Sequence, residues 1–211
     1  MRTFRRAAGD PAAVQPLENS MSTDGSARYV DLNGKGYQEK PEYMTQLKGN
    51  ILVPKTHPRI VLRGKFDTLV AKVLEVQITA KEEGYPQVVK DLDEIARFIS
   101  TILMSEVSDF PMKFTTLNGM NADELRKISH HPMEKTGTDH MMPHYGMGKM
   151  FAVVNTLRAM SRETELQGVA TFVGPDGTAE REDLLTALNR LSSAIYIIMC
   201  KVLGGVYKKG G

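Results

Sequence analysis

Four stretches of this chain repeat apolar residues at steps of three and four positions, and this spacing constrains the fold most. In the first stretch the stripe consists of Phe66, Leu69, Val70, Val73, Val76 and Ala80. Such a stripe covers one face of an α-helix, which then buries that face against other helices. Similar stripes lie within residues 86–105, 147–169 and 184–202. No strand pattern repeats, so the sequence predicts an all-α fold, an antiparallel bundle of about five helices.

Short signals between the stripes place the helix ends. The first helix is expected from Lys65 to Gly84, because glycine commonly ends helices. Asn121, followed three residues later by Glu124, has the pattern of a capping box and opens a fifth, shorter helix. The Gly-Pro-Asp-Gly turn at residues 174–177 separates the last two long helices.

The first 48 residues are rich in Gly, Pro, Ser, Asp and Asn and carry few periodic apolar positions. We expect residues 1–48 to be irregular, with a short extended piece around residues 28–32, and residues 49–211 to form the helical domain. Met21 is an alternative start, which would make the preceding residues an upstream extension. A disordered leader is the simpler interpretation of this segment, and a targeting or docking role is the alternative.

Composition and charge exclude several classes of protein. The 211 residues include 27 Lys and Arg against 25 Asp and Glu, a formal net charge of +2 that lacks the basic excess typical of nucleic-acid binders. Cys200 is the single cysteine, so neither an intrachain disulfide nor a cysteine-rich metal site can form. The longest apolar run, residues 194–200, is too short to span a bilayer, and no secretory signal is visible. We therefore expect a cytoplasmic protein without a nucleic-acid or membrane partner.

The most informative polar group lies in the segment LRAMSRETE. Arg158, Arg162 and Glu165 are four and then three residues apart, so all three project from one face of the expected helix. A solvated, salt-bridged face is the ordinary interpretation of such charges. Their apolar neighbours favour a partly buried pocket instead, and guanidinium groups suit phosphate oxygens. Polyphosphate is therefore the ligand class that this face predicts.

Polar residues on two other expected helices leave their roles open. Asn189, Ser193 and Tyr196 share one face of the otherwise apolar last helix, where they bond either to a neighbouring helix or to a ligand. Asp67 stands near the expected start of the first helix, where the helix dipole favours a carboxylate. Its default role is therefore that of a helix cap.

A loop over residues 129–146 contains four of the five histidines. The residues His130, His131, Asp139, His140 and His144 could assemble a metal site. Their spacings match no familiar zinc motif, so packing or substrate contact is the interpretation that we favour. We predict no metal site, and contact between this loop and a large flat ligand.

Several segments together closely resemble the ATP:cob(I)alamin adenosyltransferases of the ethanolamine-utilisation type. These segments are KPEYMTQL, HPRIVLRGKFDTLVAKVLEVQ, SHHPMEKTGTDHMMP, LRAMSRETE and REDLLTALNRLSSAIYIIM, within about residues 39–203. More distantly, they are similar to the propanediol-utilisation adenosyltransferases, which carry an RxxxRRAE helix and an LNRLSD helix. The resemblance implies that cob(I)alamin attacks the 5′ carbon of ATP and forms adenosylcobalamin and triphosphate. Mg²⁺ is expected to accompany the triphosphate.

The same resemblance implies roles for individual residues. Arg158 and Arg162 would stabilise the departing triphosphate, and Asp67 would pair with Arg158. The cofactor-binding residues that we expect are Glu165, Asn189, Arg190, Arg59, His140 and Met141. The last two fall near the family's aromatic residue that displaces the lower cobalt ligand.

The resemblance also implies an assembly and a cellular context. The related family forms homotrimers with active sites between subunits, so we expect a homo-oligomer, with a trimer as the first choice. Expected partners are a cobalamin-dependent ammonia-lyase and a corrinoid reductase, in or near a bacterial microcompartment.

Two departures from the family pattern keep other functions open. The Gly-rich phosphate loop of the propanediol type is not visible, and Cys200 alone cannot supply the Cys-Cys-x-x-Cys metal motif of some ethanolamine-type enzymes. A non-catalytic corrinoid-binding or delivery module is therefore the first alternative. A metallohydrolase that uses the histidine loop is the second.

Overall fold

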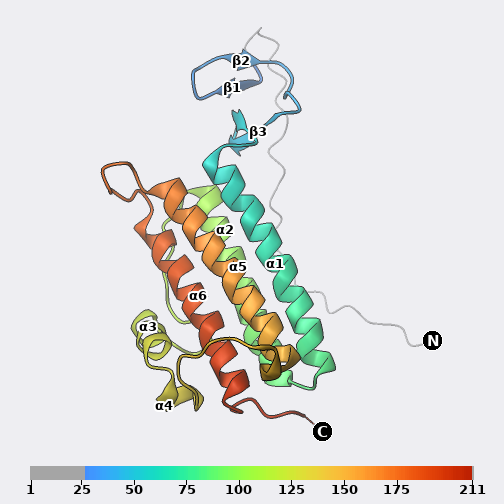
Figure 1. The fold of residues 1–211 in the computed structure, drawn as a ribbon. Helices are drawn as coiled ribbons and strands as arrows, with labels where there is room; N and C mark the ends of the chain where they lie inside the picture. Colours follow the sequence, from blue (N-terminus) through green and yellow to red (C-terminus); the bar gives the residue numbers. More distant parts are fainter. Residues whose placement is uncertain (1–26, 211) are drawn as a thin grey trace, which may run out of the picture.

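The computed structural model describes residues 27–210, which form a helical bundle with a small sheet at one end (Figure 1). The helices are α1 (Pro58–Glu82), α2 (Pro86–Ser108), α3 (Ala122–His130), α4 (Met133–Thr136), α5 (Gly148–Phe172) and α6 (Glu182–Leu203), with a 3₁₀ turn at Tyr145–Met147. The four long helices α1, α2, α5 and α6 lie side by side, and each runs antiparallel to the neighbours against which it packs most (Figure 1). The predicted antiparallel bundle is therefore confirmed.

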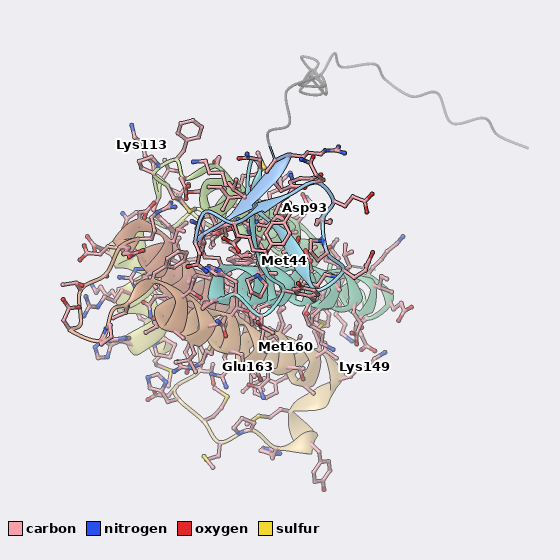
Figure 2. The ribbon with its side chains drawn as sticks, turned by 90° about the horizontal axis from the view of Figure 1, so that it is seen from above. Met44, Asp93, Lys113, Lys149, Met160 and Glu163 are labelled. Carbon is pink, nitrogen blue, oxygen red and sulfur yellow. The ribbon has the colours of Figure 1, made fainter. Side chains whose placement is uncertain are left out.

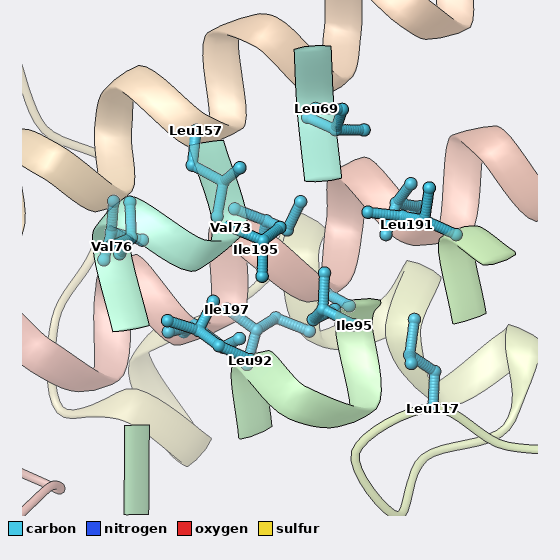
Figure 3. Close-up of a cluster of buried hydrophobic side chains, with 14 of the residues drawn as sticks. Leu69, Val73, Val76, Leu92, Ile95, Leu117, Leu157, Leu191, Ile195 and Ile197 are labelled. Atoms are coloured by element: carbon cyan, nitrogen blue, oxygen red, sulfur yellow. The ribbon is translucent and has the colours of Figure 1, made fainter. Parts of the chain in front are cut away.

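The core of the bundle is made by the predicted apolar stripes. Figure 3 shows side chains from α1, α2, α5 and α6 meeting in one cluster, in which none is exposed to solvent; they include Leu69, Val73, Leu92, Ile95, Leu157, Leu191 and Ile195. Burial of such side chains is the main favourable contribution to folding. The packing therefore fixes which face of each helix remains free for polar residues.

Helix α6 lies at the centre of this packing. By length and composition alone, it is the one helix within residues 27–210 that could cross a membrane. In the bundle, however, 56% of its most apolar window is buried, and the helix contacts α2, α3 and α5. Its hydrophobicity is thus accounted for by its place in the protein core.

A four-stranded sheet precedes the bundle, so the prediction of a purely all-α fold is wrong, and residues 29–48 contain three strands where an irregular segment was expected. The strands are β1 (Tyr29–Asp31), β2 (Gly36–Tyr37), β3 (Met44–Lys48) and β4 (Ile51–Pro54). Their order is β2-β1-β4-β3; β1 and β4 are parallel, and the other two pairs are antiparallel. A domain boundary after Lys48 would separate β3 from its neighbour β4. The expected extended piece around residues 28–32 coincides with β1.

The sheet lies over the beginning of α1, as seen from above in Figure 2, where Met44 of β3 is labelled. Met44, Leu52 and Val53 are buried, so both faces of the sheet contribute apolar side chains to the interior. A polar contact adds to this packing, because the Arg63 guanidinium of α1 donates to the Leu47 carbonyl at 2.9 Å. The sheet is thus attached to the bundle by side chains of α1.

Helix α1 begins seven residues earlier than predicted, at Pro58 instead of Lys65. The side chain of His57 caps it by accepting a hydrogen bond from the Arg59 amide, and proline suits the first turn. Asp67 consequently lies well inside the helix, where it cannot act as an N-cap, so that interpretation is wrong. At Asn121, by contrast, the predicted capping box with Glu124 is present. The predictions for residues 1–26, including the alternative start at Met21, lie outside the described residues.

Candidate functional site

A cavity of about 560 Å³ opens where α3, α5, α6 and the histidine loop meet. Its walls are formed by Arg126, Ser129, His130, His140, Arg158, Arg162, Asn189, Arg190, Ser192, Ser193 and Tyr196. Five of the predicted site residues are thus brought to one place: His140, Arg158, Arg162, Asn189 and Arg190. Ser193 and Tyr196 also face it, which favours ligand contact over packing between helices for this polar face of α6.

The cavity wall is strongly cationic. Four arginines line it, Arg126 from α3, Arg158 and Arg162 from α5, and Arg190 from α6, whereas no carboxylate belongs to the described residues of the lining. Arg158 is half-buried and its Nε donates to Asn155 Oδ1 at 3.1 Å. Arg162 is exposed and makes no hydrogen bond or ion pair within residues 27–210. Guanidinium groups without carboxylate partners are suited to bind an anion.

Glu165 lies just outside the cavity lining and holds part of its wall. One carboxylate oxygen accepts from Asn189 Nδ2 at 2.6 Å, and the other accepts from Ser192 Oγ at 2.9 Å. The carboxamide oxygen of Asn189 is thereby turned toward Arg190, whose Nη1 donates to it. The Arg190 Nε is buried and has no hydrogen-bond partner in the described part of the chain. A buried donor of this kind is normally satisfied, here by an acceptor that a ligand would bring.

Beyond the end of α3, the histidine loop contributes the imidazole of His140 to the wall. Nδ1 of His140 lies 2.6 Å from the Tyr196 hydroxyl of α6, and Nε2 lies 3.1 Å from the backbone carbonyl oxygen of His130. The two rings are stacked with their planes 23° apart. Burial, and then the neighbouring Cys200 thiol, raises the pKa of Tyr196, so its phenol stays protonated. Burial also raises the pKa of Cys200, which makes this thiol a poor nucleophile.

The part of the cavity wall that α3 contributes was missed by the sequence analysis. Arg126, Ser129 and His130 are three and four residues apart and therefore share one face of α3. That spacing was a usable signal for a polar face. What the sequence could not indicate is that α3 packs against α6 and turns this face toward α5.

Three of the predicted site residues are not brought to the cavity. Asp67 is exposed on α1 and forms no ion pair with Arg158 within the described chain. Met141 packs against the hydrophobic core from the loop. Arg59 lies instead between α1 and the end of α2, where it bonds to Glu106 and, at 2.7 Å, to Asp109. Burial opposes the charge of Arg59, but the bonds to these two carboxylates outweigh it and raise the Arg59 pKa.

Arg59 belongs to a network of ion pairs between side chains at that end of the bundle. The Glu106 carboxylate is fully buried and also accepts from Arg63 Nε at 2.6 Å. Two guanidiniums therefore compensate one buried carboxylate, which explains how the charge is tolerated. These contacts give Arg59 a structural part in holding α1 against α2.

The histidine loop gathers no metal site in the described structure. Within residues 27–210, no three side chains of His, Cys, Asp or Glu lie close enough together to hold a metal ion.

Comparisons with known proteins relate most of the chain to one group. The sequence profile of the cobalamin adenosyltransferases matches residues 37–202. Corrinoid adenosyltransferase EutT of Salmonella typhimurium is 31% identical over 191 residues, which are 90% of this chain and 70% of that protein. EutT of Escherichia coli K12 is 29% identical over 186 residues, or 88% of this chain and 68% of that protein.

Solved structures share the fold. Two variants of the PduO-type ATP:corrinoid adenosyltransferase from Lactobacillus reuteri, complexed with cobalamin and ATP, align with TM-scores of 0.61 and 0.60. Their sequences are 15% and 17% identical to this chain, and the alignments cover 80% of this chain and 93% and 90% of those chains. The likeness to these two structures concerns the fold.

Proposed function

Because a family profile covers well over half of its length, the chain belongs to the cobalamin adenosyltransferases, and we propose that it moves the 5′-deoxyadenosyl group of ATP to a reduced corrinoid. The cationic cavity is the observation that carries this proposal. Among residues 27–210 its lining presents Arg126, Arg158, Arg162 and Arg190 and no carboxylate, an arrangement suited to a polyphosphate.

The proposed reaction needs positioning and charge stabilisation more than acid–base chemistry. The cobalt(I) centre donates an electron pair to C5′ of ATP, the C5′–O bond breaks, and triphosphate departs with the bonding pair. Negative charge therefore grows on the leaving group in the transition state, and guanidiniums already in place stabilise it there. Mg²⁺ is expected with the triphosphate.

We assign the residues of the cavity to these tasks. Arg162, which has no hydrogen-bond or ion-pair partner within residues 27–210, contacts the departing triphosphate, and Arg158 does so from one helical turn earlier. Arg190 offers its unsatisfied Nε to the nucleotide, while Glu165 and Asn189 hold it in place. We place the corrinoid against the histidine loop, because His140 of that loop contacts Tyr196, about two turns along α6 from Asn189.

We further propose that the active form is a homo-oligomer, with a trimer as the first choice. Exposed apolar side chains lie on the outer faces of both helices: Leu74 and Ile78 on α1, and Leu166 and Val169 on α5. Asp67 stands on α1 about two and three turns before Leu74 and Ile78, and it has no ion-pair partner within the described chain. A second copy covering this face would bring Asp67 to Arg158 of its neighbour. Light scattering that finds a fully active monomer would contradict this arrangement.

The relatives suggest the physiological context. We infer that the adenosylcobalamin serves a cobalamin-dependent ammonia-lyase of ethanolamine utilisation, with a corrinoid reductase supplying the reduced substrate. A cytoplasmic location, in or near a microcompartment, fits this task. Deleting the gene should then abolish growth on ethanolamine with cobalamin, and added adenosylcobalamin should restore it.

The activity is tested by mixing the protein with ATP, Mg²⁺ and chemically reduced cobalamin under anoxic conditions. The expected result is the absorption spectrum of adenosylcobalamin, which bleaches under light, with protein present and not without it. Corrinoid binding without product would favour the non-catalytic delivery module. The same assay with the Arg162→Ala protein then shows whether the product depends on the cationic wall.

A further inference from the structure

Both ring nitrogens of His140 are already engaged within the protein. The His130 carbonyl oxygen can only accept a hydrogen bond, so the proton of a neutral imidazole must be on Nε2. Nδ1 then keeps the lone pair and accepts the proton of the Tyr196 hydroxyl, 2.6 Å away. Because burial raises the pKa of this phenol, it remains a donor. The imidazole therefore presents no free lone pair to the cavity.

This arrangement matters because of the chemistry proposed for the cavity. Neutral imidazole is a frequent metal ligand and binds through the nitrogen that carries the lone pair. A corrinoid cobalt beside His140 would therefore meet a potential axial ligand. Cobalt(I) reacts through a filled orbital that points along this axis, and a nitrogen lone pair there disfavours that state. A histidine on the cavity wall is useful only if its lone pair is withheld.

We propose that Tyr196 is a positioning residue that keeps His140 from binding the cobalt of the corrinoid. The hydroxyl of Tyr196 occupies the lone pair of Nδ1, and the His130 carbonyl fixes the opposite nitrogen as a donor. The stacked phenol ring further restricts rotation of the imidazole. His140 thus contacts the corrinoid as a ring and leaves the cobalt without a protein ligand. This inference rests on the proposed function, since it requires a corrinoid in the cavity.

Electron paramagnetic resonance of bound cob(II)inamide with ATP tests the inference. Cobinamide carries no lower base, so any nitrogen superhyperfine splitting of the cobalt lines reports a protein ligand. We expect the wild-type protein to bind it without such splitting. The Tyr196→Phe protein, in which Nδ1 is freed, should show the splitting, and nitrogen-15-labelled histidine should change its pattern. Tyr196→Phe/His140→Ala should lose it again.

Tyr207→Phe is the matched control, because it also removes a buried hydroxyl, one that donates to Asp91 at 2.6 Å outside the cavity. It should behave as the wild type does. Bound cob(II)inamide without nitrogen splitting in Tyr196→Phe would overturn the inference and leave the proposed function intact. So would splitting in the wild type, or splitting that survives removal of His140. If the wild-type protein binds no corrinoid, the proposed function fails and the inference fails with it.

Discussion

Removing Arg162 should separate catalysis from stability. Its side chain is exposed and makes no hydrogen bond or ion pair within residues 27–210, so Arg162→Ala should change the free energy of unfolding by no more than about 0.5 kcal/mol. In the reaction, the loss is that of a donor placed against charge that develops in the transition state. Such a loss costs about 2.7–4 kcal/mol, or about 10²–10³-fold in kcat. Since solvent screens an exposed guanidinium, we expect the lower end, about 10²-fold.

The assay compares kcat for adenosylcobalamin formation with the urea midpoint of unfolding for the same preparations. Arg97→Ala is the matched control, because Arg97 is also an exposed helical arginine, and its guanidinium forms an ion pair with Asp93 one turn away. We expect Arg97→Ala to leave both quantities unchanged. Adenosylation within a factor of about three of the wild type by Arg162→Ala would refute the assignment of this residue to the triphosphate, since such a factor corresponds to under about 1 kcal/mol.

Three further predictions concern charged residues. In a double-mutant cycle on turnover, Asp67→Ala and Arg158→Ala should give less than additive losses of activity if the two residues pair between subunits. Arg158→Lys should not retain activity. Additive losses would contradict the proposed pairing of Asp67 with Arg158. Glu106→Gln should lower the free energy of unfolding by about 3–5 kcal/mol, because it leaves two arginines at a buried site without their counter-charge, and an unchanged urea midpoint would contradict this. Arg181 lowers the pKa of Asp183 to about 2, so the carboxylate contributes about 2 kcal/mol of stability above pH 4, which is lost as the pH falls through 2. Acid unfolding of Asp183→Asn should lack this loss of stability as the pH falls through 2. A stability profile equal to that of the wild type would contradict the stabilising role of the Asp183 carboxylate.

The bundle was predictable from the sequence because each long helix has its own periodic stripe of apolar residues. A stripe such as Leu69 and Val73 on α1, or Leu191 and Ile195 on α6, repeats over several turns and buries fully in the core. The start of α1 was misplaced although Leu62 continues the apolar stripe, because Gly64 interrupts the first turns and the cap is supplied by the His57 side chain rather than by a familiar capping residue.

The sheet could not be predicted in the same way. Its strands are two to five residues long, which is too short for alternation to stand out from a Gly-rich segment. Their order also depends on pairing β1 with β4, which lie about twenty residues apart and run parallel. Pairing of that kind is a property of the folded chain and has no local signal.

The candidate site was predictable where one helix carries several of its residues. Arg158 and Arg162 follow the helical period, and so do Asn189 and Tyr196 on the next helix. Contacts between distant segments were not predictable. Arg126 enters the site because α3 packs on α6, and Arg59 is drawn to Glu106, which lies 47 residues away in the sequence.

The central claim is a transfer of the whole 5′-deoxyadenosyl group with loss of intact triphosphate. It is tested most directly with ATP labelled with carbon-13 at C5′, reduced cobalamin and the wild-type protein, followed by carbon and phosphorus NMR of the products. Our account predicts a cobalt-bound labelled carbon and one intact triphosphate for each adenosylcobalamin formed. Labelled carbon that stays on ADP or AMP, or the absence of any cobalt–carbon product while the corrinoid is bound, would contradict it.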